Sequence, residues 1–410
     1  MTHKLQKIKV EHLKFGMYVS QLDRPWLETN FLFQGFHIRT LEDIQKLRNY
    51  CDHVYVDPEK GVAVPRNLEI STRLDEEQLT RIFLSPCGDK RYPIVTPVEE
   101  ELKIARKSYD NALNLVSDIT ERICKGTRLK ADPIRKTLNS TIESILRNPD
   151  AFMWMKQLKD KDSYTYRHCV DASALAIAFG RHLGLSKPNL ENLAIGTLLF
   201  DIGKLQLPDE LLNKPTKLTS REYELIKRHV HIGAELVSDM EGSNKEIITL
   251  VMHHHERHDG KGYPCGISGN RISINGRIAS LVDCYDAITS DRPYRAALAS
   301  YEAIQQIYSC RNKDFQAEMV EQFIQCIGLY PPGTVVELNT GEVAIVIAQN
   351  RTNRLHPRVM LILDKDKKPY DRNAILNLAD KPRSKFGIFV EIKKPLPPKA
   401  YGIEPKEYYI

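Results

Sequence analysis

Four histidines lie within six residues near the middle of the chain, in the run MHHHERHDGKGYP at residues 252–264. The run is internal and follows the apolar segment IITLVM, so it is not an expression tag. Imidazole groups combined with carboxylates suit Fe, Mn, Zn or Ni. Because adjacent histidines before a Gly- and Pro-rich loop are unusual, we expect His254 and His255 to bind a metal. For His253 and His258 we favour ordinary structural roles.

Further imidazoles and carboxylates lie on segments that are otherwise apolar and helical in period. A carboxylate buried in such a segment without a partner is costly. Each residue alone would be interpreted as a buried group held by a hydrogen bond. Together with His254 and His255 they make six such positions in one helical region, which indicates a shared cation. The four additional candidates are His168, Asp201, His229 and Asp283.

The chain has 410 residues, which favours two or three domains. We predict a mainly α protein whose centre, residues 150–328, is an all-helical domain broken by one Gly-rich segment near 259–276. Residues 1–64, the N-terminal module, are predicted to be α+β, with strands at GMYVSQL and HVYVD and a helix at TLEDIQKLRNY. Residues 329–410, the C-terminal appendage, are predicted to be β-rich, with strands at TVVELN, EVAIVIAQN and RVMLILD.

Residues 65–149 are predicted to be a linker followed by helices. Prolines interrupt residues 65–96, which we interpret as the linker. Apolar residues then recur every three or four positions from Pro97 to Cys124. This helix is either a coiled coil that forms a homodimer or a packing helix of the next domain, and we favour packing. Asp132-Pro133 predicts the N-cap and first turn of another helix.

Composition excludes some functions. The longest apolar run, around residues 193–200, is far shorter than the roughly 18 residues that span a membrane. The N-terminus has no apolar core of a signal peptide, and the eight cysteines are scattered, so a cytoplasmic protein with reduced thiols is expected. The net charge of +6 suits an anionic small ligand as well as nucleic acid. No stripe of aromatic and basic residues supports nucleic-acid binding.

Five sequence motifs can be compared with known families by their order and spacing. They are YTYRH, LLFDIGK, LLNKPTKLTSRE, HHERHDGKGYP and DCYDAITSDRPYR. Together they resemble the HD-GYP family, the helical phosphodiesterases of the HD superfamily that hydrolyse cyclic di-GMP. The resemblance covers roughly residues 150–327. The first 60 or so residues are similar to an uncharacterised module that often precedes such domains.

The resemblance implies roles for individual residues. Asp201 would bridge two metals, with Fe or Mn expected, and Lys204 would lie beside the scissile phosphate. Arg292 and Arg295 would grip phosphates of the ligand, which suits the bidentate geometry of arginine. Gly262 and Tyr263 would shape the substrate loop that gives the family its name. The implied metal ligands are His168, Asp201, His229, His254, His255 and Asp283.

The sequence departs from the family at Phe200, where the histidine of the HD pair is expected. Phenylalanine has no lone pair and cannot ligate a metal. One metal would keep Asp201 and three histidines, whereas a second would be weakened, with His168, Asp283 and a share of Asp201. Tyr164 lies where some members carry a glutamate for a third metal, so we expect no trinuclear site.

Two functions stay open at this point. The first is metal-dependent hydrolysis of cyclic di-GMP to linear pGpG or GMP, impaired by Phe200 because two metals about 3.5–4 Å apart serve such hydrolysis best. The second is a catalytically inactive sensor of cyclic di-GMP, or a module that binds protein partners in cyclic di-GMP signalling. His253 and His231 are the nearby histidines that would have to replace the missing ligand, and we do not expect this rescue.

Overall fold

The computed structural model describes residues 6–23, 36–38, 40–57, 88–157, 164–212, 214, 216–290, 297–351, 353–384, 387–397 and 399–408. These residues form two compact units, a small one at the N-terminus and a larger one that comprises residues 88–352 and 356 onwards. The predicted fold class is confirmed, since helices dominate the larger unit and small sheets lie towards both ends of the chain.

The described residues of the N-terminal unit form a four-stranded antiparallel sheet with one α-helix and the short 3₁₀ helix η1 (Val10–His12). Its strands are β1 (Gln6–Lys9), β2 (Tyr18–Leu22), β3 (Phe36–His37) and β4 (His53–Val56), in the order β1-β4-β2-β3. Helix α1 (Leu41–Tyr50) begins with a capping box between Thr40 and Asp43. Its Leu47 is fully buried with Val19 and Val54 of the sheet. The two strands and the helix predicted here are confirmed, and β1 and β3 are additional.

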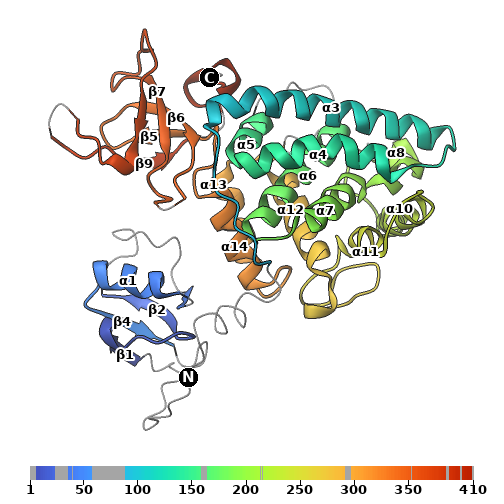
Figure 1. Cartoon of the computed structure of the whole chain (residues 1–410), viewed down its shortest axis with the longest axis horizontal. Coiled ribbons are helices and arrows are strands. Elements are labelled where there is room, and N and C mark those ends of the chain that lie inside the picture. The colour runs from blue at the N-terminus through green and yellow to red at the C-terminus, as the bar shows by residue number, and fades with distance from the viewer. Residues whose placement is uncertain are drawn as a thin grey trace. The chain divides into compact units, whose positions relative to one another are not determined.

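The larger unit begins with long helices that pack side by side (Figure 1). Buried residues of α3 recur at the spacing expected of a packing helix, and they face α4, α5 and α6. Packing is therefore the role that the structure shows for the predicted helix at 97–124. The first helices are α3 (Val98–Cys124), α4 (Ala131–Arg147), α5 (Pro149–Gln157), α6 (Tyr164–His182) and α7 (Lys187–Leu199).

The start of α4 corrects one prediction. Asp132 is not the N-cap, because the helix already begins at Ala131, after Lys130, which makes no side-chain cap. The backbone N–H of Ala131 instead donates to the carbonyl of Glu241, 2.8 Å away. A neighbouring loop thus satisfies an amide that a capping side chain would otherwise satisfy.

Shorter helices complete the helical domain and carry most of the candidate site. Gly203 lies in η3 (Ile202–Gln206), and a Cβ atom there would come within 2.0 Å of the His229 carbonyl oxygen. Only glycine allows this close approach of η3 to α10. The remaining helices are α8 (Asp209–Leu212), α9 (Ser220–Lys227), α10 (His229–Ser238), α11 (Lys245–His253), η4 (Gly269–Arg271), α12 (Ile274–Thr289), α13 (Ser300–Ser309) and α14 (Ala317–Ile327).

The C-terminal appendage is a five-stranded antiparallel sheet in the order β8-β7-β6-β5-β9. The indole N–H of Trp154 donates to the Ile347 carbonyl at 2.8 Å, and Asp150 accepts from the Gln349 amide at 2.9 Å. These bonds fix the sheet to α5. Three strands were predicted, and β8 and β9 are additional. The strands are β5 (Val335–Leu338), β6 (Val343–Ala348), β7 (Arg358–Leu363), β8 (Ile375–Asn377) and β9 (Ile392–Pro395).

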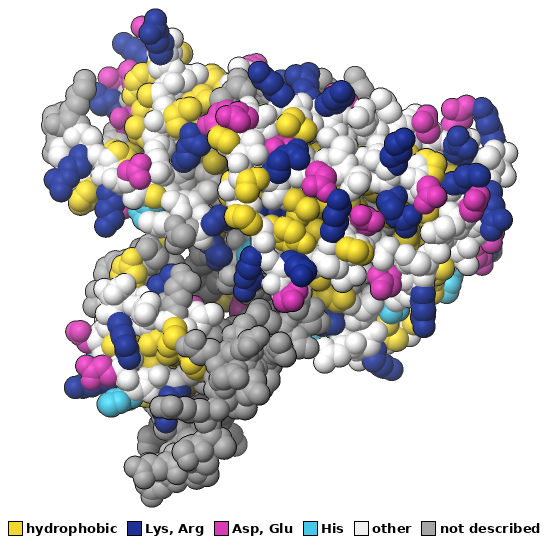
Figure 2. Space-filling model, in the orientation of Figure 1, with side chains coloured by type: hydrophobic (Ala, Val, Ile, Leu, Met, Phe, Trp, Pro, Cys, Tyr) yellow, Lys and Arg dark blue, Asp and Glu magenta, His cyan; other side chains and the backbone are white. Residues whose placement is uncertain are grey.

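Two properties of the described residues relate to the membrane and nucleic-acid functions that the sequence disfavours. Among the described residues, no helix is both long enough and apolar enough to cross a membrane. On the face of the helical domain drawn in Figure 2, Lys and Arg side chains are interspersed with Asp and Glu. That face therefore lacks the single-sign stripe that a nucleic-acid backbone would need.

Candidate metal centre

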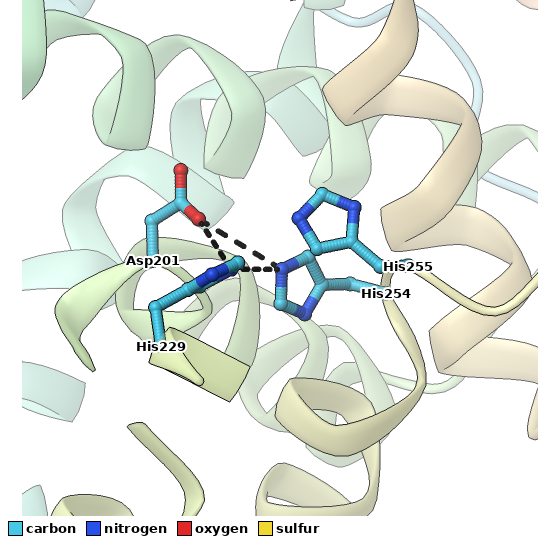
Figure 3. A group of neighbouring side chains, drawn as sticks. All are labelled: Asp201, His229, His254 and His255. Atoms are coloured by element: carbon cyan, nitrogen blue, oxygen red, sulfur yellow. Dashed lines mark hydrogen bonds and ion pairs between the residues drawn. The ribbon is translucent and has the colours of Figure 1, made fainter. Parts of the chain in front are cut away.

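Helix ends bring four candidate ligands together. Asp201 follows the end of α7, His229 is the first residue of α10, and His254 and His255 follow α11. One ligand atom from each of these residues lies within 4.8 Å of all the others (Figure 3). The helices that carry them are far apart in sequence, so the cluster is a product of the tertiary fold.

Two of the histidines are held in one tautomer. Nδ1 of His229 lies 2.6 Å from the Ile226 carbonyl, and Nδ1 of His254 lies 2.6 Å from the Val251 carbonyl. Each Nδ1 must donate to its carbonyl, so in a neutral ring the lone pair lies on Nε2. The two Nε2 atoms lie 3.4 Å apart. They also lie 3.3 Å and 3.8 Å from Oδ1 of Asp201.

This arrangement fits a metal ion. Oδ1 of Asp201 is buried and has no hydrogen-bond partner within the described part of the chain. Two imidazole nitrogens and one carboxylate oxygen thus converge on one point. Burial also lowers the pKa of His254, and that of His255 more strongly, which keeps both rings neutral and able to ligate. A divalent cation would satisfy all of these groups at once.

Lys204 stabilises the negative charge of Asp201. Its Nζ donates to Oδ2 of Asp201 at 2.6 Å. Burial alone would raise the pKa of Asp201, but the ammonium group of Lys204 holds this pKa well below its usual range. Burial would likewise lower the pKa of Lys204, and the Asp201 carboxylate raises it instead. The pair is therefore ionised at neutral pH.

His168 and Asp283 lie on the other side of Asp201. Nε2 of His168, on α6, is 3.2 Å from Oδ1 of Asp283, on α12, and 3.6 Å from Oδ2 of Asp201. Asp283 also lies 3.9 Å from Nδ1 of His255. All six residues predicted as metal ligands are thus neighbours in one buried region. Four form the compact cluster, and His168 and Asp283 flank it.

Asp286 is a member of the site that sequence reasoning missed. It is fully buried on α12, and its Oδ2 lies 2.7 Å from Nδ1 of His168. Burial would lower the pKa of His168, but Asp283 and Asp286 outweigh it and raise this pKa to about 9. Asp286 therefore fixes the ring so that Nε2 faces the centre. Its position three residues after Asp283 on an apolar helix was the available signal.

Phe200 fills the space beside the ligands. Its side chain is fully buried at the end of α7. The ring centroid lies 5.7 Å from that of His168, in a stacked arrangement, and 5.0 Å from that of His254. An apolar ring thus lies beside both His168 and His254 of the compact cluster. No imidazole replaces it in the described cluster, since His231 is exposed and Nδ1 of His253 accepts from the Ser273 amide at 3.1 Å.

The loop after His255 is shaped by close backbone contacts. A Cβ atom on Gly262 would come within 2.5 Å of the His255 carbonyl oxygen, so a side chain there is excluded. The amide of Tyr263 donates to the same carbonyl at 3.2 Å. Glu256, buried and also missed by sequence reasoning, accepts from the amides of Cys265 at 2.7 Å and Ile267 at 3.1 Å. The loop is thereby held with the Tyr263 ring 4.6 Å from that of His255.

Two predicted ligand-binding residues, Arg292 and Arg295, lie outside the described residues. The side chain of Tyr164 lies outside them as well. The predicted roles of all three remain predictions.

The buried His168–Asp286 hydrogen bond leads to a testable prediction. In the Asp286→Asn variant, the amide is a weaker acceptor and His168 is less well oriented. We therefore expect the metal affinity of the site that includes His168 to fall about 10- to 100-fold. Competition with a metal-binding dye measures this affinity. The matched control is Asp239→Asn, an exposed change after α10 that should leave affinity unaltered. Unchanged affinity in Asp286→Asn would show that His168 needs no such support.

A helical domain that gathers buried histidines and aspartates around one point defines the metal-dependent hydrolases of the HD type. Family models agree with this class. The model of the HD domain matches residues 151–318. A domain of unknown function, DUF3391, matches residues 5–134, and the KOW domain associated with HD domains matches residues 335–386.

Three characterised relatives narrow the class. Cyclic di-GMP phosphodiesterase PA4108 of Pseudomonas aeruginosa is 34% identical over 357 residues, which cover 87% of this chain and 84% of that protein. A cyclic di-GMP phosphodiesterase of Thermotoga maritima is 36% identical over 169 residues, 40% of this chain and 45% of that protein. The 3′3′-cGAMP-specific phosphodiesterase 1 of Vibrio cholerae is 34% identical over 144 residues, 35% of this chain and 33% of that protein. The chain belongs to the HD-GYP family of the HD superfamily.

Proposed function

We propose that this protein binds cyclic di-GMP at its metal centre and that Phe200 impairs hydrolysis of this ligand to linear pGpG or GMP. The observation that carries the proposal is the coexistence of a compact Asp201–His229–His254–His255 cluster with an apolar ring where another ligand would be expected. The similarity of nearly the whole chain to PA4108 supports cyclic di-GMP as the ligand.

One metal would be held well and a second weakly. The compact cluster offers three imidazoles and a carboxylate, which suits Fe or Mn. His168 and Asp283, with a share of Asp201, would hold the second. When bound, such metals supply Lewis-acid activation of water and phosphate for hydrolysis. With one weak site, ligand binding would persist while the charge of the transition state would be stabilised less well.

The surrounding side chains would bind and orient the ligand. Lys204, whose Nζ lies 2.6 Å from Oδ2 of Asp201, would place a positive charge beside a phosphate at the centre. We propose Arg292 and Arg295 as further phosphate contacts, because guanidinium groups bind phosphate oxygens bidentately. Tyr263 beside His255 would border the ligand. We also propose a cytoplasmic location, where cyclic di-GMP signalling proteins meet this ligand.

A second candidate is a purely non-catalytic sensor, or an interaction module for protein partners, favoured by the complete burial of Phe200. One experiment separates the two. Protein loaded anaerobically with Fe(II) or Mn(II) is titrated with cyclic di-GMP by calorimetry, and linear products are followed by chromatography. Binding with slow product formation is expected. Binding without any product would favour the sensor. Absence of binding would contradict both the impaired enzyme and the sensor and leave the interaction module.

A further inference from the structure

Aromatic rings lead from the metal centre to the surface. The Tyr263 ring lies 4.6 Å from the ring of the predicted ligand His255 and is tilted by 30°. The Tyr223 ring of α9 in turn meets Tyr263 edge-on, with 6.3 Å between centroids. Tyr223 is 46% exposed, so the row ends on a ring that is open to solvent.

A fixed cation lies over the outer two rings. Nζ of Lys227 is 4.8 Å from the centroid of Tyr223 and 5.4 Å from that of Tyr263. The same Nζ donates to Glu224 at 2.7 Å. An ammonium group held beside two aromatic faces can donate hydrogen bonds to a planar ligand that packs against those faces.

The folding of α9 does not account for this exposed tyrosine. No residue of the helix is buried, so Tyr223 contributes nothing to a core. The helix is nevertheless well fixed. Thr219 and Glu222 form a capping box, and Nζ of Lys214 donates to both carboxylate oxygens of Glu222, at 2.7 Å and 2.8 Å. A large ring is therefore presented to solvent on a rigid support beside the metal centre.

We propose that Tyr223, Tyr263 and Lys227 form a subsite for one guanine base of the ligand. The inference rests on the proposed function, since a phosphate at the metal centre would leave an attached nucleoside beside this row of rings. A purine stacks on an aromatic face whatever its identity. Guanine alone presents two acceptors, O6 and N7, on one edge, whereas adenine presents a donor beside N7. Lys227 would therefore favour guanine over adenine.

Calorimetry with cyclic di-GMP tests the stacking. Tyr223→Ala should weaken binding about 5- to 150-fold, the range that one stacked base supplies. Tyr223→Phe keeps the ring and should bind within about two-fold of the unmodified protein. Tyr401→Ala, which removes another exposed tyrosine in the C-terminal appendage, should have no effect. Metal content, measured in every variant, should stay constant.

Cyclic di-AMP tests the selectivity. Lys227→Ala should lower the ratio of the affinity for cyclic di-GMP to that for cyclic di-AMP about ten-fold. This is the low end of the discrimination that one base-edge contact supplies. The outcomes are distinguishable. If the unmodified protein binds no cyclic di-GMP, the proposed function fails and the subsite with it. If it binds and Tyr223→Ala binds equally well with its metal retained, the subsite alone is overturned.

Discussion

The Phe200→His variant should hydrolyse cyclic di-GMP roughly 100-fold faster than the unmodified protein, or more. The Phe200 ring is centred 5.7 Å from the ring of His168 and 5.0 Å from that of His254, so an imidazole in its place would lie beside ligands of both proposed metal sites. It would add a nitrogen ligand to the weak second site. A second metal supplies several kcal/mol of transition-state stabilisation, and each 1.4 kcal/mol is a factor of ten. Chromatography of linear product under anaerobic Fe(II) or Mn(II) measures the change.

Phe200→Leu is the matched control for this gain. It keeps the position apolar and fully buried but offers no lone pair, and it should remain as slow as the unmodified protein. Its cavity should lower the free energy of unfolding by roughly 1–3 kcal/mol, which a urea titration detects. A Phe200→His protein that folds, binds ligand and shows no faster turnover would mean that Phe200 does not limit catalysis.

Asp201→Ala should abolish both metal binding at the centre and any hydrolysis. Asp201 is the only carboxylate of the compact cluster, and it faces His229 through one oxygen and Lys204 through the other. Its removal leaves three imidazoles beside an ammonium group, which repels a divalent cation. Elemental analysis and product chromatography measure the two losses.

The control for this change is Asp209→Ala, at an exposed aspartate that begins α8. It should keep the metal content and the activity of the unmodified protein. Circular dichroism should show that both variants remain folded, because Lys204 is partly exposed and can turn to solvent once its partner is removed. Full metal occupancy in folded Asp201→Ala would exclude Asp201 as a ligand.

Periodicity and residue type predicted most of the fold. The apolar spacing from Pro97 to Cys124 predicted α3 to within one residue, since a packed helix must bury one face. The short strands β8 and β9 were not predicted, because they carry weak apolar patterns. The N-cap at Asp132 was wrong for a different reason: its role is taken by a contact with Glu241, which is distant in sequence.

The candidate site was partly predictable for the same reasons. Ionisable residues on apolar segments were visible in the sequence, and they are the ones that cluster. Asp286 and Glu256 were not predicted as site residues. Asp286 is bonded to the side chain of His168 and Glu256 to the amide of Cys265, and the sequence does not reveal such partners. Tyr223 gave no signal either, since exposure and the neighbouring rings are properties of the tertiary structure.

The metal content of the purified, anaerobically loaded protein tests the central claim most directly. One strongly held equivalent is expected from the compact cluster, with a second that is lost on dialysis against a weak chelator. Phe200→His, treated identically, should keep two. Two equivalents retained by the unmodified protein would contradict the account, because they would show that Phe200 does not weaken the second site.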